Sequence, residues 1–400
     1  MINIGVIREG KTPPDERVVL TPMQIQRISK AHPNVNIEVQ SSPIRRVKDE
    51  EYSKLGVEVK RDVSSQDILI GVKEIPVDQL VAGKTCFFFS HTIKMQPYNK
   101  ALLQAVLNKK ITLIDWECLT DARGRRLIGF GRYAGIVGTY NGFRAYGLKH
   151  GRFKLKKATE CEDRMELQRE LEKVRVPPLK ILLSGRGKVA KGSMEILDRL
   201  GIRKVGIREY LKQQFNEPVY CQVTFQDYFK RTDGKEFDIA AFLKDGSGHK
   251  SDFMRFARVT DYYIAGHYWD SSAPFIFTRE DARNPDFKIS LVADISCDID
   301  GPVACTLRPS TIADPFYGYD PISELEVPFD SPNSITVMAV DNLPCELPRD
   351  ASHDFGEMFI HGVLPSLLNG DKHGILKRAT IAKNGSLTDA YQYLKSWVES

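Results

Sequence analysis

The 400-residue sequence has no run of about 18 apolar residues, the length that a membrane-spanning helix needs. Its first residues, MINIGVIREG, read as a strand and lack the apolar core and small-residue cleavage site of a secretory leader. The seven cysteines are scattered and form no CxxC pair, which is atypical of a disulfide scaffold or a cysteine-based metal site. We therefore expect a cytoplasmic protein with reduced thiols, no membrane partner and no metal.

Strong charge of one sign is also missing. The formal net charge is +5 over 400 residues, and no basic stripe alternates with aromatic residues. This pattern argues against nucleic acid as a partner and favours a small anionic substrate. The sequence has no internal repeat and no low-complexity linker, and its length predicts two domains of about 150–200 residues each.

The first 135 residues alternate apolar runs with amphipathic segments. This rhythm predicts βαβ units and a mostly parallel sheet covered by helices. The predicted strands are 2–9, 35–40, 67–73, 84–91 and 111–117, and the predicted helices are 21–32 and 99–110.

A second α/β unit follows. Residues 136–176 are predicted to be helical, and Pro177-Pro178 ends that stretch. Strands of this unit are predicted at 179–185, 204–209, 237–243, 261–269 and 289–296. After residue 330 one more strand is predicted at 334–344, before two terminal helices.

A glycine-rich turn follows the first strand of this second unit. Gly185, Gly187 and Ala190 form a G-x-G-x-x-A pattern between an apolar strand and a helix, which suits the pyrophosphate of a dinucleotide. Such a pattern alone is often only a turn, but the flanking strand and helix favour a dinucleotide site. Glu209, 24 residues after Gly185, is placed to bind a ribose 2′-hydroxyl and favours NAD slightly over NADP. Arg208 and Lys204 would instead suit the 2′-phosphate of NADP.

Three successive strands of the first unit end in polar residues. Lys73-Glu74 closes one strand, His91 closes the next, and Glu117 closes the third. Because the carboxyl ends of parallel strands share one sheet edge, we expect these groups to converge. A lysine near apolar walls has a lowered pKa and can act as a general base. The alternative is an ordinary strand-end lysine beside a structural histidine.

Arginines form a second group of candidates. Arg17, Arg125, Arg126 and Arg132 lie in the segments PDERVVLTP and DARGRRLIGFGRYAG. A guanidinium group binds a carboxylate with two hydrogen bonds, so several of them near a cofactor suggest a substrate with more than one carboxylate. Scattered surface arginines are the alternative.

Motifs along nearly the whole chain resemble one family. REGKTPPDERVVLTP, GVKEIP, FFFSHTIKMQ, LIDWE, GRRLIGFGRYAG, the Gly185 turn, ADISCDIDG and VDNLPCELPRDAS occur in the order typical of lysine-forming saccharopine dehydrogenase. FFFSHTIKMQ and the tail IAKNGSLTDAYQYLKSWVES resemble the lysine–ketoglutarate reductase half of the bifunctional lysine-degrading enzyme. Both belong to the broader group of alanine dehydrogenase and the transhydrogenase α-subunit.

The resemblance implies roles for individual residues. Lys73 matches a proton acceptor, His91 a proton donor, and Glu74 and Glu117 the carboxylates that adjust their pKa values. The implied substrate contacts are Arg17, Arg126, Phe130, Ser296, Cys297 and Asp298. The implied cofactor surroundings are Gln96, Arg125, Gly187, Lys188, Ile295, Val340, Asp341, Asn342 and Leu343.

The resemblance also implies a fold and a reaction. The fold would be two Rossmann-like α/β domains, each a mostly parallel sheet with helices on both faces, with the active site in the cleft between them. Residues 1–135 with 330–400 would form the substrate domain, and 136–329 the dinucleotide-binding domain. The implied activity is nicotinamide-dependent cleavage of saccharopine to lysine and 2-oxoglutarate, in lysine metabolism. An alanine dehydrogenase-like enzyme and a non-catalytic nucleotide-binding subunit are the rival hypotheses, and the sequence leaves monomer or dimer open.

Overall fold

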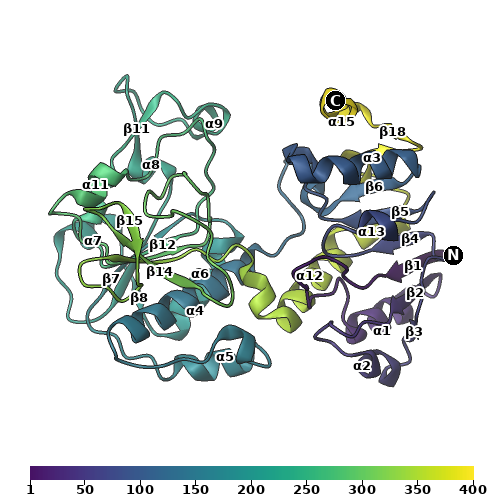
Figure 1. Ribbon diagram of the computed structural model, residues 1–400, viewed down its shortest axis with the longest axis horizontal. Coiled ribbons are helices and arrows are strands. Elements are labelled where there is room, and N and C mark those ends of the chain that lie inside the picture. The colour runs from purple at the N-terminus through teal and green to yellow at the C-terminus, as the bar shows by residue number, and fades with distance from the viewer. The chain divides into compact units, whose positions relative to one another are not determined.

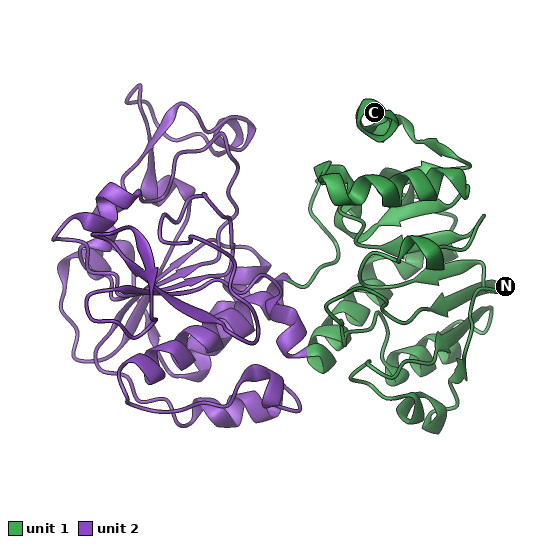
Figure 2. Ribbon diagram, viewed as in Figure 1, with its two compact units in different colours: residues 1–130, 348–400 green, residues 131–347 purple.

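A computed structural model describes residues 1–400, and the chain divides into two compact units. Unit 1 contains residues 1–130 and 348–400, and unit 2 contains residues 131–347 (Figure 2). Each unit is built on an eight-stranded sheet that is mostly parallel and is flanked by helices (Figure 1). No helix combines the length and the apolar character that crossing a bilayer requires.

The sheet of unit 1 has the strand order β18-β17-β6-β5-β4-β1-β2-β3. Strands β1 to β6 pair in parallel, and the β17–β18 hairpin joins β6 antiparallel, so the end of the chain extends the N-terminal sheet. The strands are β1 (Ile2–Val6), β2 (Val35–Gln40), β3 (Glu58–Lys60), β4 (Ile68–Ile70), β5 (Thr85–Phe88), β6 (Thr112–Asp115), β17 (Thr380–Lys383) and β18 (Ser386–Leu387).

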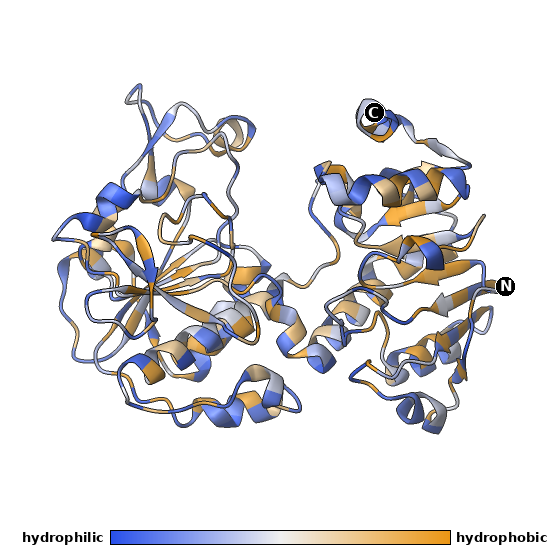
Figure 3. Ribbon diagram, in the orientation of Figure 1, coloured by the Kyte–Doolittle hydropathy of each residue, from blue (hydrophilic) through white to orange (hydrophobic).

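Helices cover both faces of this sheet, and successive strand residues enter two different cores. On β4, Leu69 belongs to the core that contains Leu103 of α3, and Ile70 belongs to the core that contains Phe355 of α12. Strands buried on both faces read as continuous apolar runs, and the apolar residues concentrate on the strands (Figure 3). The helices are α1 (Pro22–Ala31), α2 (Asp49–Lys54), α3 (Lys100–Asn108), α12 (Pro348–Gly362), α13 (Leu364–Leu368), α14 (Ile375–Ala379) and α15 (Lys395–Glu399).

The sheet of unit 2 has the order β15-β14-β16-β13-β12-β7-β9-β8, in which β14 and β15 are antiparallel and the other strands are parallel. A small antiparallel hairpin, β10 (Phe229–Arg231) with β11 (His249–Ser251), lies outside it. The strands of the sheet are β7 (Lys180–Ser184), β8 (Arg203–Lys204), β9 (Val219–Val223), β12 (Tyr262–Ala265), β13 (Leu291–Asp294), β14 (Phe316–Asp320), β15 (Leu325–Val327) and β16 (Ile335–Met338).

Glycines allow the two longest helices of unit 2, α4 (Gly131–Lys149) and α6 (Lys188–Arg199), to pack backbone against backbone. A Cβ on Gly135 would lie 1.9 Å from the carbonyl oxygen of Val189, and a Cβ on Gly192 would lie 1.9 Å from that of Arg132. The small-residue run in α4 is therefore a packing surface. The other helices are α5 (Arg164–Leu171), α7 (Ile207–Lys212), α8 (Phe225–Tyr228), α9 (Ile239–Lys244), α10 (Met254–Ala257) and α11 (Arg279–Arg283).

Unit 2 also differs from the sequence predictions. Residues 237–243, predicted as a strand, lie largely in α9, which begins where Asp238 accepts hydrogen bonds from two backbone N–H groups. The helix predicted over 136–176 is interrupted: α4 ends at Lys149, and between residues 150 and 176 only α5 is α-helical. Strand β16, predicted to belong to the first domain, pairs with β13 and β14, so unit 1 resumes at Pro348 rather than near residue 330.

Candidate active site

The polar residues that end the strands of unit 1 lie along one edge of the sheet. Lys73 and Glu74 follow β4, His91 follows β5, and Glu117 follows β6. These three strands are parallel neighbours, so their carboxyl ends share one edge, as predicted. Residues that are 44 positions apart in the sequence thus belong to a single site.

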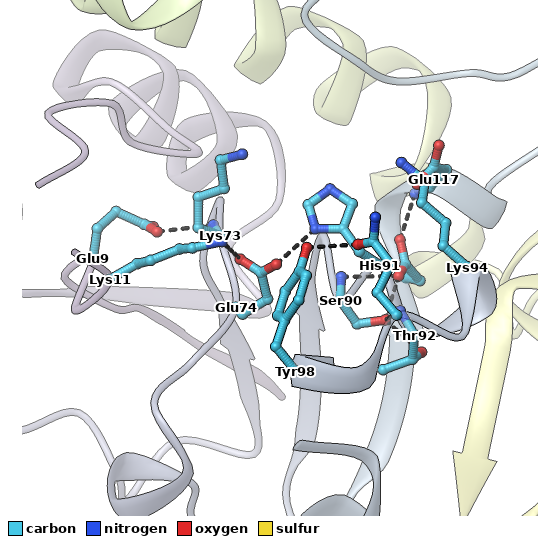
Figure 4. A network of polar contacts seen from close by, with 12 residues as sticks. Glu9, Lys11, Lys73, Glu74, Ser90, His91, Thr92, Lys94, Tyr98 and Glu117 are labelled. Atoms are coloured by element: carbon cyan, nitrogen blue, oxygen red, sulfur yellow. Dashed lines mark hydrogen bonds and ion pairs between the residues drawn. The ribbon is translucent and has the colours of Figure 1, made fainter. Parts of the chain in front are cut away.

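Glu74 connects two side chains at this edge. Its Oε1 lies 2.6 Å from His91 Nδ1, and its Oε2 lies 2.8 Å from Lys11 Nζ (Figure 4). Burial raises the pKa of Glu74, but the hydrogen bonds from His91 and Lys11 outweigh burial and bring that pKa to about 2. Glu74 is therefore ionised at neutral pH. It orients the imidazole through Nδ1, and His91 Nε2 makes no hydrogen bond within the protein.

Lys73 presents an amine without a partner. Its side chain is half-buried, and Nζ makes neither a hydrogen bond nor an ion pair (Figure 4). Burial lowers the pKa of Lys73, and the nearby positive charge of Arg17 lowers it further, against the opposite effect of Asp15 and Glu74. These are the conditions under which a lysine serves as a proton acceptor.

Glu9 is a member of this site that the sequence predictions missed. Its two carboxyl oxygens accept hydrogen bonds from the backbone N–H groups of Val72 and Lys73, at 2.7 and 2.8 Å. Burial, reinforced by Asp15, raises the pKa of Glu9 to about 8. Glu9 and Lys11 follow β1, the parallel neighbour of β4, so the strand-end rule that finds Lys73 also applies to them.

Arg17 is buried and already paired. Its Nε and terminal nitrogen lie 2.9 and 2.6 Å from the two oxygens of Asp15, and the residue is 3% exposed. The guanidinium also lies 4.1 Å from the ring centroid of Phe130, which stacks on Phe355. The structure thus makes Arg17 part of the framework behind the site, and its role as a substrate contact stays a prediction.

Arg126 is more accessible than Arg17. Its guanidinium is half-exposed and forms a 2.8 Å ion pair with Glu117 Oε1. The other oxygen of Glu117 is buried and accepts no hydrogen bond. Two predicted cofactor contacts are exposed in the same unit: Arg125 pairs with Asp121, and Gln96 accepts a hydrogen bond from Tyr98.

The glycine turn of unit 2 has the geometry that a dinucleotide requires. Gly185 has φ +98°, and a Cβ there would lie 2.3 Å from the carbonyl oxygen of Gly266. Gly187 caps α6, and a Cβ at that position would meet no atom within 4 Å, so the space before the helix is open. Lys188 is the first residue of α6, and Ala190 is buried. An open N-terminus of a 12-residue helix after a tight turn fits a pyrophosphate.

The remaining predicted residues of unit 2 follow neighbouring strands of the same sheet. Residues 295–298 follow β13, and residues 340–343 follow β16, its parallel neighbour. Buried Asp294 fixes the first loop by accepting hydrogen bonds from the backbone and hydroxyl of Ser296 and from the backbone of Cys297. The Cys297 thiol donates to the carbonyl of Ala339, and burial raises its pKa to about 12, so it stays neutral. These loops lie at the carboxyl edge, where α/β sheets bind ligands.

Glu209 lies elsewhere than the sequence predicts. It is the third residue of α7, and its carboxylate pairs with Arg203 at 3.2 Å. The strand before it, β8, pairs with β9 and not with β7, so β9 is the strand beside the glycine turn. Gln222 of β9 donates to the carbonyl of Gly185 and accepts from Lys204, each at 2.8 Å. Arg208 is exposed.

Comparisons with known proteins identify relatives. Residues 5–137 match the family model described as alanine dehydrogenase/PNT, N-terminal domain. The chain is 30% identical to mitochondrial alpha-aminoadipic semialdehyde synthase of Mus musculus, over 98% of this chain and 47% of that protein. It is 26% identical to saccharopine dehydrogenase (NAD+, L-lysine-forming) of Neurospora crassa, over 88% of this chain and 87% of that protein. The chain thus spans about half the length of the synthase.

Two solved structures share the fold. An L-alanine dehydrogenase aligns over 99% of both chains with a TM-score of 0.66 and 15% identity. A transhydrogenase from Sinorhizobium meliloti aligns over 96% of this chain and 98% of its own with a TM-score of 0.57 and 13% identity. At these identities the likeness concerns the fold, and it confirms the predicted pair of Rossmann-like α/β domains.

Proposed function

We propose that this chain, a homologue of the saccharopine dehydrogenases and aminoadipic semialdehyde synthases, cleaves saccharopine reversibly to lysine and 2-oxoglutarate. The premise includes its match to the alanine dehydrogenase/PNT N-terminal domain. The observation that carries this proposal is the unpaired amine of Lys73 at the same sheet edge as the hydrogen-bonded pair His91–Glu74. The proposed enzyme depends on a nicotinamide dinucleotide and belongs to lysine metabolism.

The reaction needs the proton transfers that these residues can perform. The nicotinamide, when bound, takes up or delivers the hydride. In the direction of cleavage, water then adds to the carbon–nitrogen double bond of the oxidised substrate, and a base must take its proton. The neutral amine of Lys73 is that base. The nitrogen that leaves as lysine then takes a proton from His91, whose imidazolium form Glu74 stabilises. The carbon–nitrogen bond breaks, and the hydroxyl left by the added water loses its proton to solvent as it becomes the carbonyl of 2-oxoglutarate.

The cofactor-binding residues proposed here are the backbone of Gly185 and Gly187 and the first turn of α6. Beside this turn the chain offers the amide of Gln222 and the ammonium of Lys204. Thr224 follows β9, and the carboxylate of Asp227 turns back to accept hydrogen bonds from its backbone and hydroxyl. A neutral amide and a cation suit a 2′-phosphate, so we propose that NADP is used at least as well as NAD. The slight preference for NAD rested on Glu209, which is not on the strand beside the turn.

A substrate panel tests the proposal. The rate of oxidation of NADH and of NADPH is measured separately with lysine plus 2-oxoglutarate and with pyruvate plus ammonia. We expect turnover with the first pair and little or none with the second. Efficient reduction of pyruvate with ammonia, and none of 2-oxoglutarate with lysine, would replace the proposal with an alanine dehydrogenase-like activity.

A further inference from the structure

Unit 2 contains a solvent-open cavity of about 490 Å³, lined by Arg144 of α4, the segment 154–160 and residues 170–173 at the end of α5. This volume is within the range of small-molecule sites. Its lining is strongly basic: it includes Arg144 and the four lysines Lys154, Lys156, Lys157 and Lys173, against two glutamates. Figure 1 shows α4 and α5 together on one side of unit 2.

Two of these five cations are neutralised within the protein. Lys156 Nζ forms a 2.6 Å ion pair with Glu166, and Lys173 Nζ forms one of the same length with Glu170. The side chains of the other three, Arg144, Lys154 and Lys157, form no hydrogen bond or ion pair. The cavity thus keeps an excess of unpaired positive charge.

Arg144 is the most constrained of the three. It is half-buried on α4, and its Nε is buried without a hydrogen-bond partner. The guanidinium lies 5.2 Å from the ring centroid of Phe316, which holds it in place. Burial lowers the pKa of Arg144, and the negative charges of Glu346 and Glu160 raise it, although neither carboxylate forms an ion pair with Arg144. Arg144 lines the cavity and no side chain pairs with its guanidinium, so its charge is available to an anion there.

The walls of the cavity are fixed by internal contacts. Tyr140 of α4 donates to the carbonyl of Lys156 at 2.8 Å, and Glu170 of α5 accepts from the backbone N–H of Lys156 at 3.0 Å. These bonds join the lysine-rich segment to both helices. The cations therefore line a formed cavity and do not lie on a freely mobile loop.

We propose that this cavity is a binding site for a small anion with at least two negatively charged groups, phosphates or carboxylates. Arg144 would bind one group through its planar donors, and Lys154 and Lys157 would neutralise the remaining charge. The site is separate from the glycine turn, because α4 meets α6 near Gly131, about 20 Å along the helix from Arg144. It is independent of the reaction proposed above.

Calorimetric titration and thermal unfolding of the full chain test this site. Sodium pyrophosphate and sodium citrate serve as probes of the phosphate and carboxylate classes, at an ionic strength held constant with sodium chloride. We expect saturable binding and a rise in Tm with at least one probe, and the probe that binds identifies the class. Saturable binding of neither probe would overturn the proposal.

Substitutions locate the binding. Arg144→Gln should weaken the Kd at least about tenfold. The double variant Lys154→Gln/Lys157→Gln should weaken it comparably, and it preserves the test if Arg144→Gln fails to fold. Lys212→Gln, an exposed lysine of α7, removes a charge elsewhere in unit 2 and should leave the Kd unchanged. Wild-type affinity in both the arginine and the lysine variants would place the anion elsewhere, such as at the glycine turn, and would overturn the proposal.

Discussion

His91 Nδ1 and Glu74 Oε1 lie 2.6 Å apart although 17 residues separate them in the chain. The contact joins the ends of β4 and β5, and a second bond, 2.8 Å from Lys11 Nζ, holds Glu74 from the other side. The carboxylate therefore fixes the orientation of the imidazole and leaves Nε2 available for proton transfer. The proposed proton transfers depend on this arrangement and on the unpaired amine of Lys73.

The first prediction concerns Glu74. Glu74→Gln removes the negative charge that stabilises the imidazolium of His91, so kcat should fall on the order of tenfold or more. Lys11→Gln is the matched control, because it removes the other partner of Glu74 and keeps the bond to His91. A larger loss of kcat in Lys11→Gln than in Glu74→Gln would contradict the role given to Glu74.

Glu9 gives a prediction about stability and pH. Its pKa in the folded protein is about 8, above the ordinary value of 4.5, so between these pH values the folded state binds a proton that the unfolded chain releases. The free energy of unfolding should therefore decrease as pH rises from 4.5 to 8, by at most about 1.4 kcal/mol per pH unit from this group. Glu9→Gln cannot titrate, so its stability should depend less steeply on pH. Urea unfolding between pH 5 and 8 measures both slopes, and equal slopes would refute the assignment.

The same variant tests how Lys73 is positioned. Glu9 holds the backbone N–H groups of Val72 and Lys73, and glutamine can accept only one of these two bonds. The kcat of the Glu9→Gln variant should therefore fall, while its affinity for the nicotinamide cofactor should stay unchanged.

The two arginines should respond differently to removal. Arg126→Ala should raise the KM for 2-oxoglutarate and saccharopine roughly 10- to 150-fold, because a substrate carboxylate loses a charge-assisted partner. Its Tm should change little, since the Arg126 side chain is 51% exposed. Arg17→Ala should instead destabilise the fold by about 3–5 kcal/mol, because buried Asp15 loses its counter-charge. An unchanged KM in folded Arg126→Ala would remove that residue from the substrate site.

Cofactor choice provides a further comparison. If the region beside β9 contacts the ribose, Lys204→Ala should raise the KM for NADPH more than the KM for NADH. Glu209→Ala should change both KM values by less than about threefold, since this carboxylate pairs with Arg203 on the surface. If Glu209→Ala selectively weakened NADH binding, Glu209 would be the residue that contacts the ribose, contrary to this prediction.

Part of the site could be predicted because parallel strands bring their carboxyl ends together. Lys73, His91 and Glu117 each follow a strong apolar run, and their three strands are neighbours both in the sequence and in the sheet. Glu9 was missed because β1 is the neighbour of β4, three strands later in the chain. Local sequence does not encode that adjacency.

The same limit explains why the predicted position of Glu209 differs from the structure. The pattern around residues 204–209 resembles a strand, but β8 is a two-residue edge strand, and β9 lies between it and β7. The strand predicted at 237–243 failed for a local reason: Asp238 caps a helix there, and the apolar run that follows is short enough to suit either structure.

The most direct test of the central claim is to identify the product formed by the wild type and by Lys73→Met. Each protein is incubated with lysine, 2-oxoglutarate and reduced cofactor, and saccharopine is quantified by mass spectrometry while cofactor binding is measured by fluorescence. We predict saccharopine from the wild type, a rate of formation lower by on the order of 10²–10⁴ in Lys73→Met, and unchanged cofactor affinity. Absence of saccharopine with the wild type, or near-normal formation by Lys73→Met, would contradict the account.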